Sequence, residues 1–394
     1  MSLIEVKNLY KIFGNKPKKV VLLLEKGLSK DEILNKTGNT VGISNASFEV
    51  DQGEFFVVMG LSGSGKSTLI RCLNRLVEPT TGEIIIDGDD ILKADKDKLK
   101  DIRRKKISMV FQHFGLFPHR TVIANVEYGL EIQGVEPQKR TEKAKEAIKL
   151  VGLEGYEDSM PNELSGGMQQ RVGLARALAN DPDILLMDEA FSALDPLIRK
   201  EMQDELLELQ SKMKKTIIFI THDLDEALKL GDRIAVMKDG KVVQIGSAED
   251  ILTNPANDYV KEFVQDVDRS RVVTAEAIMR KPDALISSKD GPRVAARKMK
   301  ENEFSSIYVT DKNRKLQGIV RIEDASKAIE RGEKSLENII IKDVPKTSPE
   351  QQIIDLLPTA KTSDYPIAVI DEQNTLLGII VRASIILGII GEEV

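Results

Sequence analysis

At 394 residues, of which 41% are apolar, the chain is too long for one ordinary hydrophobic core and has enough apolar material for at least two domains. Its net charge of −6 comes from interspersed acidic and basic residues, so no nucleic-acid-binding surface is indicated and nucleic acid is not expected as a partner. The chain has a single cysteine and opens without a signal sequence, which predicts a cytosolic protein. Its apolar runs are far shorter than the roughly 20 residues of a spanning helix, so we expect it to reach a membrane only through a partner.

The start of the chain has the pattern of strands that lead to a nucleotide-binding loop. Short β-rich runs with alternating apolar residues occupy 4–10, 41–50 and 54–60. Between the first two runs, Ser29 and Glu32 fit a capping box and Gly38 fits a helix stop, which predicts a short inserted helix. A decorated surface loop is the alternative interpretation of this insertion.

Strand and helix patterns alternate farther along. A solvated helix is expected at 94–106, before an apolar strand, and a helical subdomain is expected from about 113 to 165. Strand patterns resume at 183–188, 216–221 and 232–246, with helical patterns between them. This alternation predicts an α/β fold with a mostly parallel sheet covered on both faces.

The last third of the chain contains a two-copy repeat. Residues 306–320 recur as 366–380 at an offset of 60, with identical residues for Ile307, Val309, Asp311, Leu316, Gly318 and Ile319. We therefore expect a second module built from two similar halves.

The segment GLSGSGKS at 60–67 satisfies the pattern G-x-x-x-x-G-K-[ST] between a predicted strand and a predicted helix. In such a loop, backbone N–H groups surround phosphates, the lysine meets the β- and γ-phosphates, and the serine hydroxyl ligates Mg²⁺. We predict a site for ATP and Mg²⁺ that contains Gly60, Ser62, Gly63, Ser64, Gly65, Lys66, Ser67 and Thr68. A chance glycine-rich turn is the alternative.

The apolar run at 183–188 ends in an aspartate, and a glutamate follows directly. Because the carboxyl edge of an α/β sheet is where ligands bind, Asp188 is expected to hold the magnesium shell. Glu189 lies one residue farther out and is expected to orient and polarise the attacking water. A solvated acidic pair at a strand end is the alternative.

Two more polar residues follow strands on the same expected edge. Gln112 is expected to reach the metal or the attacking water, and His222 to hydrogen-bond the γ-phosphate. A lone histidine is more often structural, and His113 and His119 are assigned to that class.

A second glycine loop, LSGGMQQR, begins at Leu164. Ser165 is expected to cap a helix, in whose first turn Gly166 and Gly167 each cost about 1 kcal/mol relative to alanine. Helix stability does not explain these glycines, whereas close approach to an anion does. The first loop already surrounds the phosphates of one nucleotide. If the second loop serves the same γ-phosphate, it must approach from the opposite side, most simply from another copy of the chain.

The combined motifs of residues 1–265 resemble those of an ABC-transporter ATPase. They are the loop at 60–67, Gln112, LSGGMQQR, the strand ending in Asp188 and Glu189, SALD at 192–195, and His222. The resemblance implies an ATPase in which two copies pair head to tail, with ATP between the first loop of one copy and the second loop and Asp195 of the other.

The same resemblance assigns further contacts. It implies an aromatic residue under the adenine, for which Phe13 is the matching position and Tyr10 the rival; a core role is the alternative for either. It also implies that the helical subdomain grips an integral membrane permease through the apolar residues of 113–130, although packing inside the subdomain explains these residues equally well.

The insertion, the wording MDEAFSALDPLIR with Ala190, and the C-terminal repeat are similar to the ATPase subunits of glycine betaine/proline importers. The resemblance implies a peripheral protein on the cytoplasmic face of the membrane that powers uptake of a quaternary-amine solute and works indirectly with a solute-binding protein or domain. The alternatives are an importer ATPase for another small solute, a soluble ABC ATPase outside transport, and a nucleotide sensor without catalysis.

The C-terminal repeat resembles a tandem CBS pair, with copies at 272–333 and 335–391 after a linker at 266–271. Ligand-binding CBS copies carry a hydroxyl residue and, three residues later, an aspartate for the ribose. Here the first copy has Arg321 and Asp324 and the second has Val381 and Ser384, so the usual adenosine pose is not expected. We expect a regulatory tail that senses ionic strength or a nucleotide such as a cyclic dinucleotide; dimerisation alone is the alternative.

Overall fold

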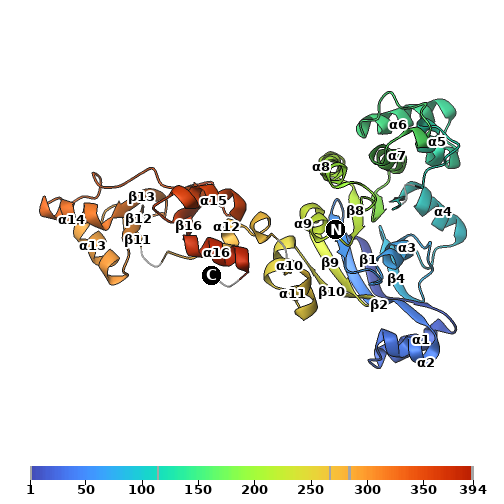
Figure 1. Ribbon diagram of the computed structural model, residues 1–394, viewed down its shortest axis with the longest axis horizontal. Coiled ribbons are helices and arrows are strands. Elements are labelled where there is room, and N and C mark those ends of the chain that lie inside the picture. The colour runs from blue at the N-terminus through green and yellow to red at the C-terminus, as the bar shows by residue number, and fades with distance from the viewer. Residues whose placement is uncertain (1, 113–114, 266–267, 283–284, 392–394) are drawn as a thin grey trace. The chain divides into compact units, whose positions relative to one another are not determined.

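The computed structural model describes residues 2–112, 115–265, 268–282 and 285–391, and folds into two compact units, Met1–Gln265 and Asp266–Val394 (Figure 1). Each unit has apolar clusters of its own. His113, which the sequence assigned a structural role, and residues 266–267 of the expected linker lie outside the described residues.

One layer of the first unit is an antiparallel sheet with the order β2-β1-β4-β5. Its strands are β1 (Ser2–Phe13), β2 (Thr40–Asp51), β4 (Thr81–Ile86) and β5 (Asp89–Asp90). Phe48 and Val50 are buried while Glu49 between them is exposed, which is the period-two pattern of a sheet with one packed face.

The second layer is a six-stranded sheet with the order β10-β9-β3-β8-β7-β6, parallel except for β10. Its strands are β3 (Phe55–Met59), β6 (Ile107–Val110), β7 (Ile184–Asp188), β8 (Thr216–Thr221), β9 (Arg233–Lys238) and β10 (Lys241–Gly246). All residues of β3, β7 and β8 are buried, as expected for parallel strands covered on both faces. The parallel register brings the carboxyl ends of β3, β6, β7 and β8 to one edge, as the sequence predicted.

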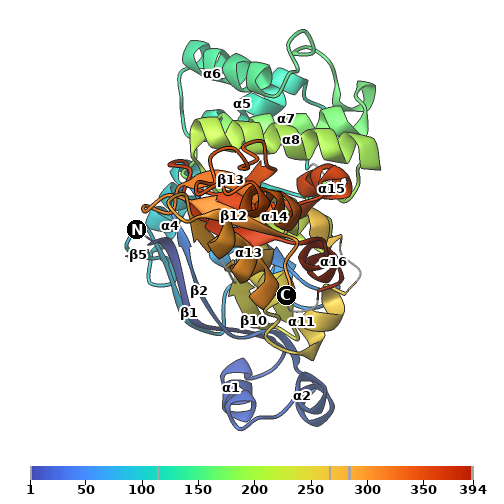
Figure 2. The ribbon, with the colours of Figure 1, turned by 90° about the vertical axis from the view of Figure 1, so that its left-hand side faces the viewer.

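The helices around these sheets are α3 (Lys66–Leu73), α4 (Lys96–Lys105), α8 (Pro196–Met213), α9 (Leu224–Leu230), α10 (Ala248–Thr253) and α11 (Asp258–Phe263). The helical subdomain consists of α5 (Val122–Ile132), α6 (Pro137–Leu150), η1 (Pro161–Glu163) and α7 (Gly166–Leu178). Figures 1 and 2 show α5, α6 and α7 together at one end of this unit, with the insertion at the other.

The insertion between β1 and β2 forms two helices, α1 (Pro17–Glu25) and α2 (Lys30–Thr37) (Figure 2). The predicted capping box and helix stop of α2 are confirmed: Ser29 and Glu32 bond reciprocally, and Gly38 has φ 68°. A plain surface loop is therefore wrong, and α1 is a helix that the sequence patterns did not predict. Its buried Val20 and Val21 pack with Ile33 of α2 against β1.

The second unit contains two three-stranded sheets, ordered β11-β12-β13 and β14-β15-β16. Its strands are β11 (Leu285–Ser287), β12 (Ser306–Thr310), β13 (Leu316–Arg321), β14 (Lys346–Thr347), β15 (Ile367–Ile370) and β16 (Leu376–Ile380). Its helices are η2 (Arg269–Arg271), α12 (Ala275–Ile278), α13 (Pro292–Glu301), α14 (Ile322–Glu330), α15 (Ile353–Thr362) and α16 (Arg382–Ile390). Both sheets have the same parallel and antiparallel pairings, so the predicted repeat is a structural repeat.

The two copies exchange a segment. Val273, Ala275 and Ile278, which precede the first sheet, pack into the core of the second copy with Ile353 and Ile380. Arg280 also exchanges backbone hydrogen bonds with Ile379. The packing boundary therefore differs from the linear boundary expected at 272, because the segment before the first copy completes the second.

Among the residues that the structure describes, none of the helices combines the length and apolar character needed to cross a bilayer.

Candidate functional site

The first glycine loop joins the buried strand β3 to α3, and its lysine is turned back into the loop. Lys66 is 5% exposed, and its Nζ donates to the carbonyl oxygens of Gly60 at 2.7 Å and Leu61 at 3.1 Å. Burial lowers the pKa of Lys66, although the carboxylates of Glu189 and Asp188 act in the opposite direction. A buried cation whose hydrogen bonds go to neutral carbonyl oxygens is suited to receive an anion.

The backbone around this loop leaves no room for a side chain at Gly60 or Gly65. Gly65 has φ +107°, and a Cβ there would collide with the carbonyl oxygen of Gly42. Ser64 is buried, and its Oγ has no hydrogen-bond partner among the described residues. An unpaired buried hydroxyl in a glycine-rich loop fits a site whose remaining partner is a phosphate. Ser62 and Gly63 are exposed at its tip, and Ser67 and Thr68 are half-buried in the first turn of α3.

Phe13 lies beside this loop and Tyr10 does not. A Cβ on Gly42 would lie 2.9 Å from Cε2 of Phe13 and 3.2 Å from Cγ2 of Thr68, so the ring of Phe13 reaches the start of α3. Phe13 is 42% exposed, whereas Tyr10 is 8% exposed within the cluster of the insertion. The structure thus gives Tyr10 the core role and leaves Phe13 partly exposed, with Nζ of Lys11 over its ring at 4.7 Å from the centroid.

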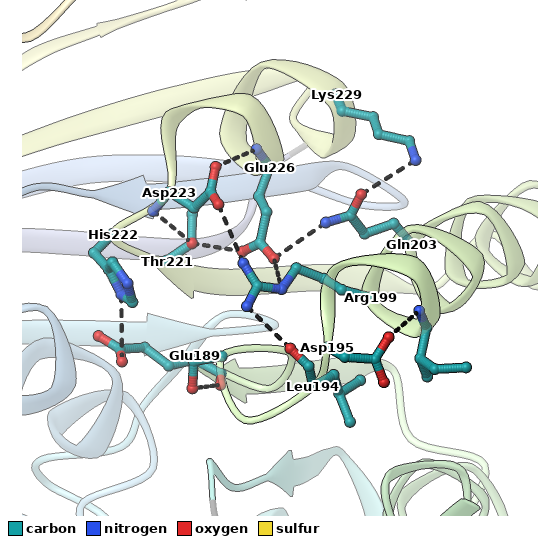
Figure 3. A network of polar contacts seen from close by, with 12 residues as sticks. Glu189, Leu194, Asp195, Arg199, Gln203, Thr221, His222, Asp223, Glu226 and Lys229 are labelled. Carbon is teal, nitrogen blue, oxygen red and sulfur yellow. Dashed lines mark hydrogen bonds and ion pairs between the residues drawn. The ribbon is translucent and has the colours of Figure 1, made fainter. Parts of the chain in front are cut away.

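The polar strand ends meet at the carboxyl edge of the central sheet. Nε2 of Gln112 lies 3.3 Å from Oε2 of Glu189. Nδ1 of His222 lies 3.5 Å from the same oxygen (Figure 3). Glu189 has a positive φ of 47°, a conformation that costs free energy and that needs support from its surroundings. Two residues 110 positions apart, Gln112 and His222, therefore converge on the carboxylate of Glu189, at the edge where their places after strands predicted them.

Asp188 is 4% exposed at the end of β7, and its carboxylate contacts Arg71, which the sequence interpretation missed. Nη2 of Arg71 lies 3.3 Å from Oδ2 of Asp188. A signal was available, because Arg71 follows Ser67 by four residues and so projects from the same face of α3. Ser192 was also missed: its Oγ bonds the carbonyl oxygen of Glu189 at 2.9 Å and accepts from Gln112 at 3.3 Å.

The second glycine loop begins α7 as predicted. Ser165 caps the helix by accepting the N–H of Met168 at 3.3 Å, and Gly166 is exposed. Packing within the chain also explains why residue 167 is a glycine, which the sequence interpretation did not include. A Cβ there would lie 2.6 Å from Cγ2 of Ile198 in α8. Close packing inside one chain therefore contributes to the glycine requirement.

Asp195 caps α8, accepting the N–H of Ile198 at 3.1 Å (Figure 3). Among the described residues, no hydrogen bond or ion pair joins Asp195 or residues 165–167 to the first glycine loop. The structure of one chain thus brings Gln112, Glu189 and His222 together and leaves the second glycine loop apart, where α7 packs on α5 and α6.

Comparison with known proteins adds the family. The family model described as ABC transporter matches residues 43–192, and the CBS domain model matches 275–331. The glycine betaine/carnitine transport ATP-binding protein GbuA of Listeria monocytogenes is 57% identical over 394 residues, covering all of this chain and 99% of its own length. The chain belongs to the ABC transporter family of ATP-binding proteins.

Two further relatives extend this comparison. The trimethylamine N-oxide transport ATP-binding protein TmoW of Pelagibacter ubique is 50% identical over 323 residues, or 80% of this chain and 94% of its own. A solved dimeric ATP-binding cassette in a post-hydrolysis state, bound to ADP and Pi, is 35% identical with a TM-score of 0.53 and covers 62% of this chain and 98% of its own.

These findings confirm the predicted fold class, a P-loop ABC cassette with a RecA-like core and helical subdomain followed by a CBS module. The chain is an ABC-type ATPase.

Proposed function

We propose that this ATPase powers the uptake of a quaternary-amine compatible solute of the glycine betaine, proline and carnitine class through a membrane permease. The similarity to GbuA over the whole chain carries the proposal, because it includes the insertion and the C-terminal unit outside the matched cassette segment. The name of TmoW supports an alternative methylated solute, trimethylamine N-oxide. A non-transport ABC ATPase is the remaining alternative.

ATP is proposed to bind with its phosphates in the first glycine loop and its adenine on Phe13. The unpaired Oγ of Ser64 and the buried ammonium of Lys66 support this placement, since both gain a partner when phosphate binds. Ser165, Gly166, Gly167 and Asp195 are proposed to complete the site from a second copy, paired head to tail.

Mg²⁺ is proposed to bind Ser67, Gln112 and Asp188. The three offer hydroxyl, amide carbonyl and carboxylate oxygens, which are the hard donors that this ion accepts alongside phosphate oxygens and water. When bound, the ion neutralises charge on the phosphates. Among the described residues, no cluster of three or more histidine, cysteine or acidic side chains forms a metal site without such partners.

Hydrolysis is proposed to use Glu189 as the group that orients water and accepts its proton. Gln112 and His222 approach the same carboxylate oxygen and so can hold it in place. His222 is 58% exposed in its side chain, which leaves its ring accessible to the γ-phosphate.

Docking to the permease is proposed at a cavity of about 380 Å³ between the core and the helical subdomain. Its lining includes Phe111, Phe117, Tyr128 and Arg176. Within the segment 113–130, Val122, Val126 and Leu130 are buried, so internal packing accounts for these three residues. Phe117 and Tyr128 border the cavity instead, which supports docking and a peripheral place at the cytoplasmic face of the membrane.

The CBS unit is proposed to regulate transport without the usual adenosine pose. Nε of Arg321 lies 2.6 Å from Oδ2 of Asp324, so the carboxylate expected to bind ribose already has a cation. Ser384 of the second copy is 1% exposed and is not accessible to a ligand. The proposed signals are ionic strength, or a cyclic dinucleotide bound at the dimer interface of the CBS pair. The basic residues Arg297 and Lys300 of α13 are exposed.

The proposal is tested by uptake of labelled glycine betaine after a salt upshift, in cells whose only copy of the subunit is wild type or Glu189→Gln. Loss of the carboxylate is expected to cost about 10²-fold or more in hydrolysis. Uptake in wild type that is lost in the variant supports the proposal. Uptake of trimethylamine N-oxide alone would favour the alternative solute, and equal uptake in both strains would reject the transport assignment.

Regulation is tested separately by deleting residues 272–394. Unchanged uptake across salt concentrations and cyclic dinucleotide additions would reject a regulatory tail.

A further inference from the structure

The hydrogen bonds of Arg199 join two loops that carry proposed site residues (Figure 3). Arg199 lies in the first turn of α8, and its Nη2 donates to the carbonyl oxygen of Leu194 at 3.1 Å, next to Asp195. Its Nη1 donates to Oδ2 of Asp223 at 3.4 Å, next to His222. One guanidinium therefore holds both the loop that ends in Asp195 and the loop that contains His222.

The residues on either side of His222 are fixed by the same network (Figure 3). Thr221 donates its Oγ1 to Oε2 of Glu226 at 2.6 Å and accepts the N–H of Asp223 at 2.9 Å. Asp223 in turn accepts the N–H of Glu226 at 3.2 Å and so caps α9. The place of His222 near Glu189 therefore depends on contacts that Arg199 completes.

Glu226 is the buried end of the network, with 5% exposure, and also accepts from Nε2 of Gln203 at 3.1 Å. Its Oε1 lies 3.9 Å from Nε of Arg199, which is too long for a hydrogen bond. That Nε is buried and has no hydrogen-bond partner among the described residues. Because an unpaired buried donor is unfavourable, a small shift that closes this gap gains free energy.

The first turn of α8 also contacts the second glycine loop. Ile198, the neighbour of Arg199, is the residue that leaves no space for a side chain at Gly167. A displacement of that loop toward α8 must therefore move Ile198, since close-packed atoms transmit strain. The turn that carries Arg199 thus contacts Gly167, Asp195 and the loop of His222.

We propose that Arg199 is a positioning residue for ATP hydrolysis, which sets the place of His222 beside Glu189 according to the place of Asp195 and the second glycine loop. The inference rests on the head-to-tail pairing of the proposed function, in which those two elements contact the ATP held by the other copy. Arg199 then couples the two ATP sites through a single chain. A lysine cannot replace it, because one ammonium group lacks the planar fork that holds two acceptors in different directions.

The test is steady-state ATP hydrolysis by the full chain carrying Arg199→Gln, Arg199→Lys or Glu226→Gln. Arg199→Gln is expected to lower kcat about tenfold or more and to change KM for ATP by less than about twofold, since Arg199 contacts none of the proposed ATP-binding side chains. Arg199→Lys is expected to recover less than half of this loss. The double variant Arg199→Gln/Glu226→Gln is expected to be no slower than the slower single variant, because coupled residues are not additive.

Arg233→Gln is the matched control. Arg233 is 40% exposed in its side chain and pairs at 3.2 Å with the buried Glu54, at the end of β3 opposite the first glycine loop. Arg233→Gln is expected to lower the melting temperature about as much as Arg199→Gln does, and to leave kcat within about twofold of the wild-type value. If Arg199→Gln does not fold, Glu226→Gln carries the test alone, and it is expected to lower kcat while KM for ATP changes by less than about twofold.

A kcat of Arg199→Gln equal to that of the control, a change confined to KM, or effects of the two variants that multiply would each overturn the inference. The head-to-tail pairing has its own test, the mixing experiment with Lys66→Ala and Ser165→Arg chains given below. If the mixture is inactive while Arg199→Gln still lowers kcat, the coupling between the two ATP sites is rejected, and the role of Arg199 in positioning His222 is retained.

Discussion

Arg71 and Asp188 are 117 positions apart and form an ion pair at 3.3 Å, in which a cation from the helix after the first glycine loop neutralises the carboxylate that ends β7. Asp188 is buried and the side chain of Arg71 is 49% exposed, so the arginine is the member that can withdraw into solvent. The carboxylate proposed to hold Mg²⁺ therefore has an alternative cation within the chain.

The first prediction follows from this exchange of cations. Arg71→Gln is expected to destabilise the nucleotide-free chain by about 1–2 kcal/mol, because it leaves a buried carboxylate unpaired. Saturating Mg²⁺ and ADP are expected to remove most of this difference, since the ion then replaces the arginine. Thermal unfolding of both chains with and without Mg–ADP is the measurement, and an equal loss in both conditions would contradict the exchange.

The second prediction concerns the packing of Gly167. Gly167→Ala is expected to destabilise the chain by about 1–3 kcal/mol, because the new methyl group overlaps Cγ2 of Ile198. The double variant Gly167→Ala/Ile198→Ala is expected to lose less stability than the sum of the two single losses, because the smaller side chain removes the overlap. Denaturant unfolding of the four chains measures the coupling, and strict additivity would show that the contact is not the cause.

The third prediction tests the shared ATP site by mixing two inactive chains. Lys66→Ala removes the cation of the first glycine loop, and Ser165→Arg blocks the second loop. A mixed pair keeps one intact site, built from the first loop of the Ser165→Arg chain and the second loop of the Lys66→Ala chain. Hydrolysis is therefore expected in the mixture and in neither chain alone; an inactive mixture of well-folded chains would reject head-to-tail pairing.

The fourth prediction is a pH dependence of stability. Burial raises the pKa of Glu226, while hydrogen bonds from Thr221 and Gln203 act in the opposite direction. A carboxyl group whose pKa is higher in the folded chain favours folding most below its unfolded pKa, and this contribution is lost as pH rises through its folded value. Glu226→Gln is therefore expected to flatten the decline in stability from about pH 5 toward neutral pH.

Urea unfolding of wild type and Glu226→Gln at several pH values measures this effect. Because burial raises the pKa of Glu226 and disfavours its ionised form, the variant is expected to lose less stability at higher pH than it does at acidic pH. A constant difference between the two chains across the range would contradict the assignment to Glu226. The same variant then separates folding from the expected loss of kcat.

The fifth prediction concerns the CBS unit. Arg321→Thr supplies the missing hydroxyl group and releases Asp324 from its ion pair. AMP is expected to bind this variant more tightly than the parent chain, when both carry Lys66→Ala to weaken binding at the ATP site. Calorimetric titration of the two full chains with AMP is the measurement, and unchanged affinity would show that the ion pair does not block the ribose position.

Much of the fold was predictable because its signals are short. The capping box of Ser29 and Glu32, the cap at Ser165 and the fully apolar strands β3, β7 and β8 are each encoded within a few consecutive residues. The polar residues after those strands were predicted to meet because parallel strands share one carboxyl edge. α1 was not predicted, because its N-cap residue, Lys16, has a left-handed backbone conformation and provides no side-chain cap.

The sequence by itself determined the chemistry of each segment: a phosphate loop with Lys66, an acidic strand end with Asp188 and Glu189, a second glycine loop, and a duplicated C-terminal module. Only the tertiary structure decided which distant residues meet those segments. Arg71 at Asp188, Ile198 at Gly167, Arg199 between the loops of Asp195 and His222, and Val273 in the core of the second CBS copy are all such contacts. They depend on helix faces and packing distances, which a linear pattern does not encode, because side-chain neighbours in a folded core come from segments remote in the chain.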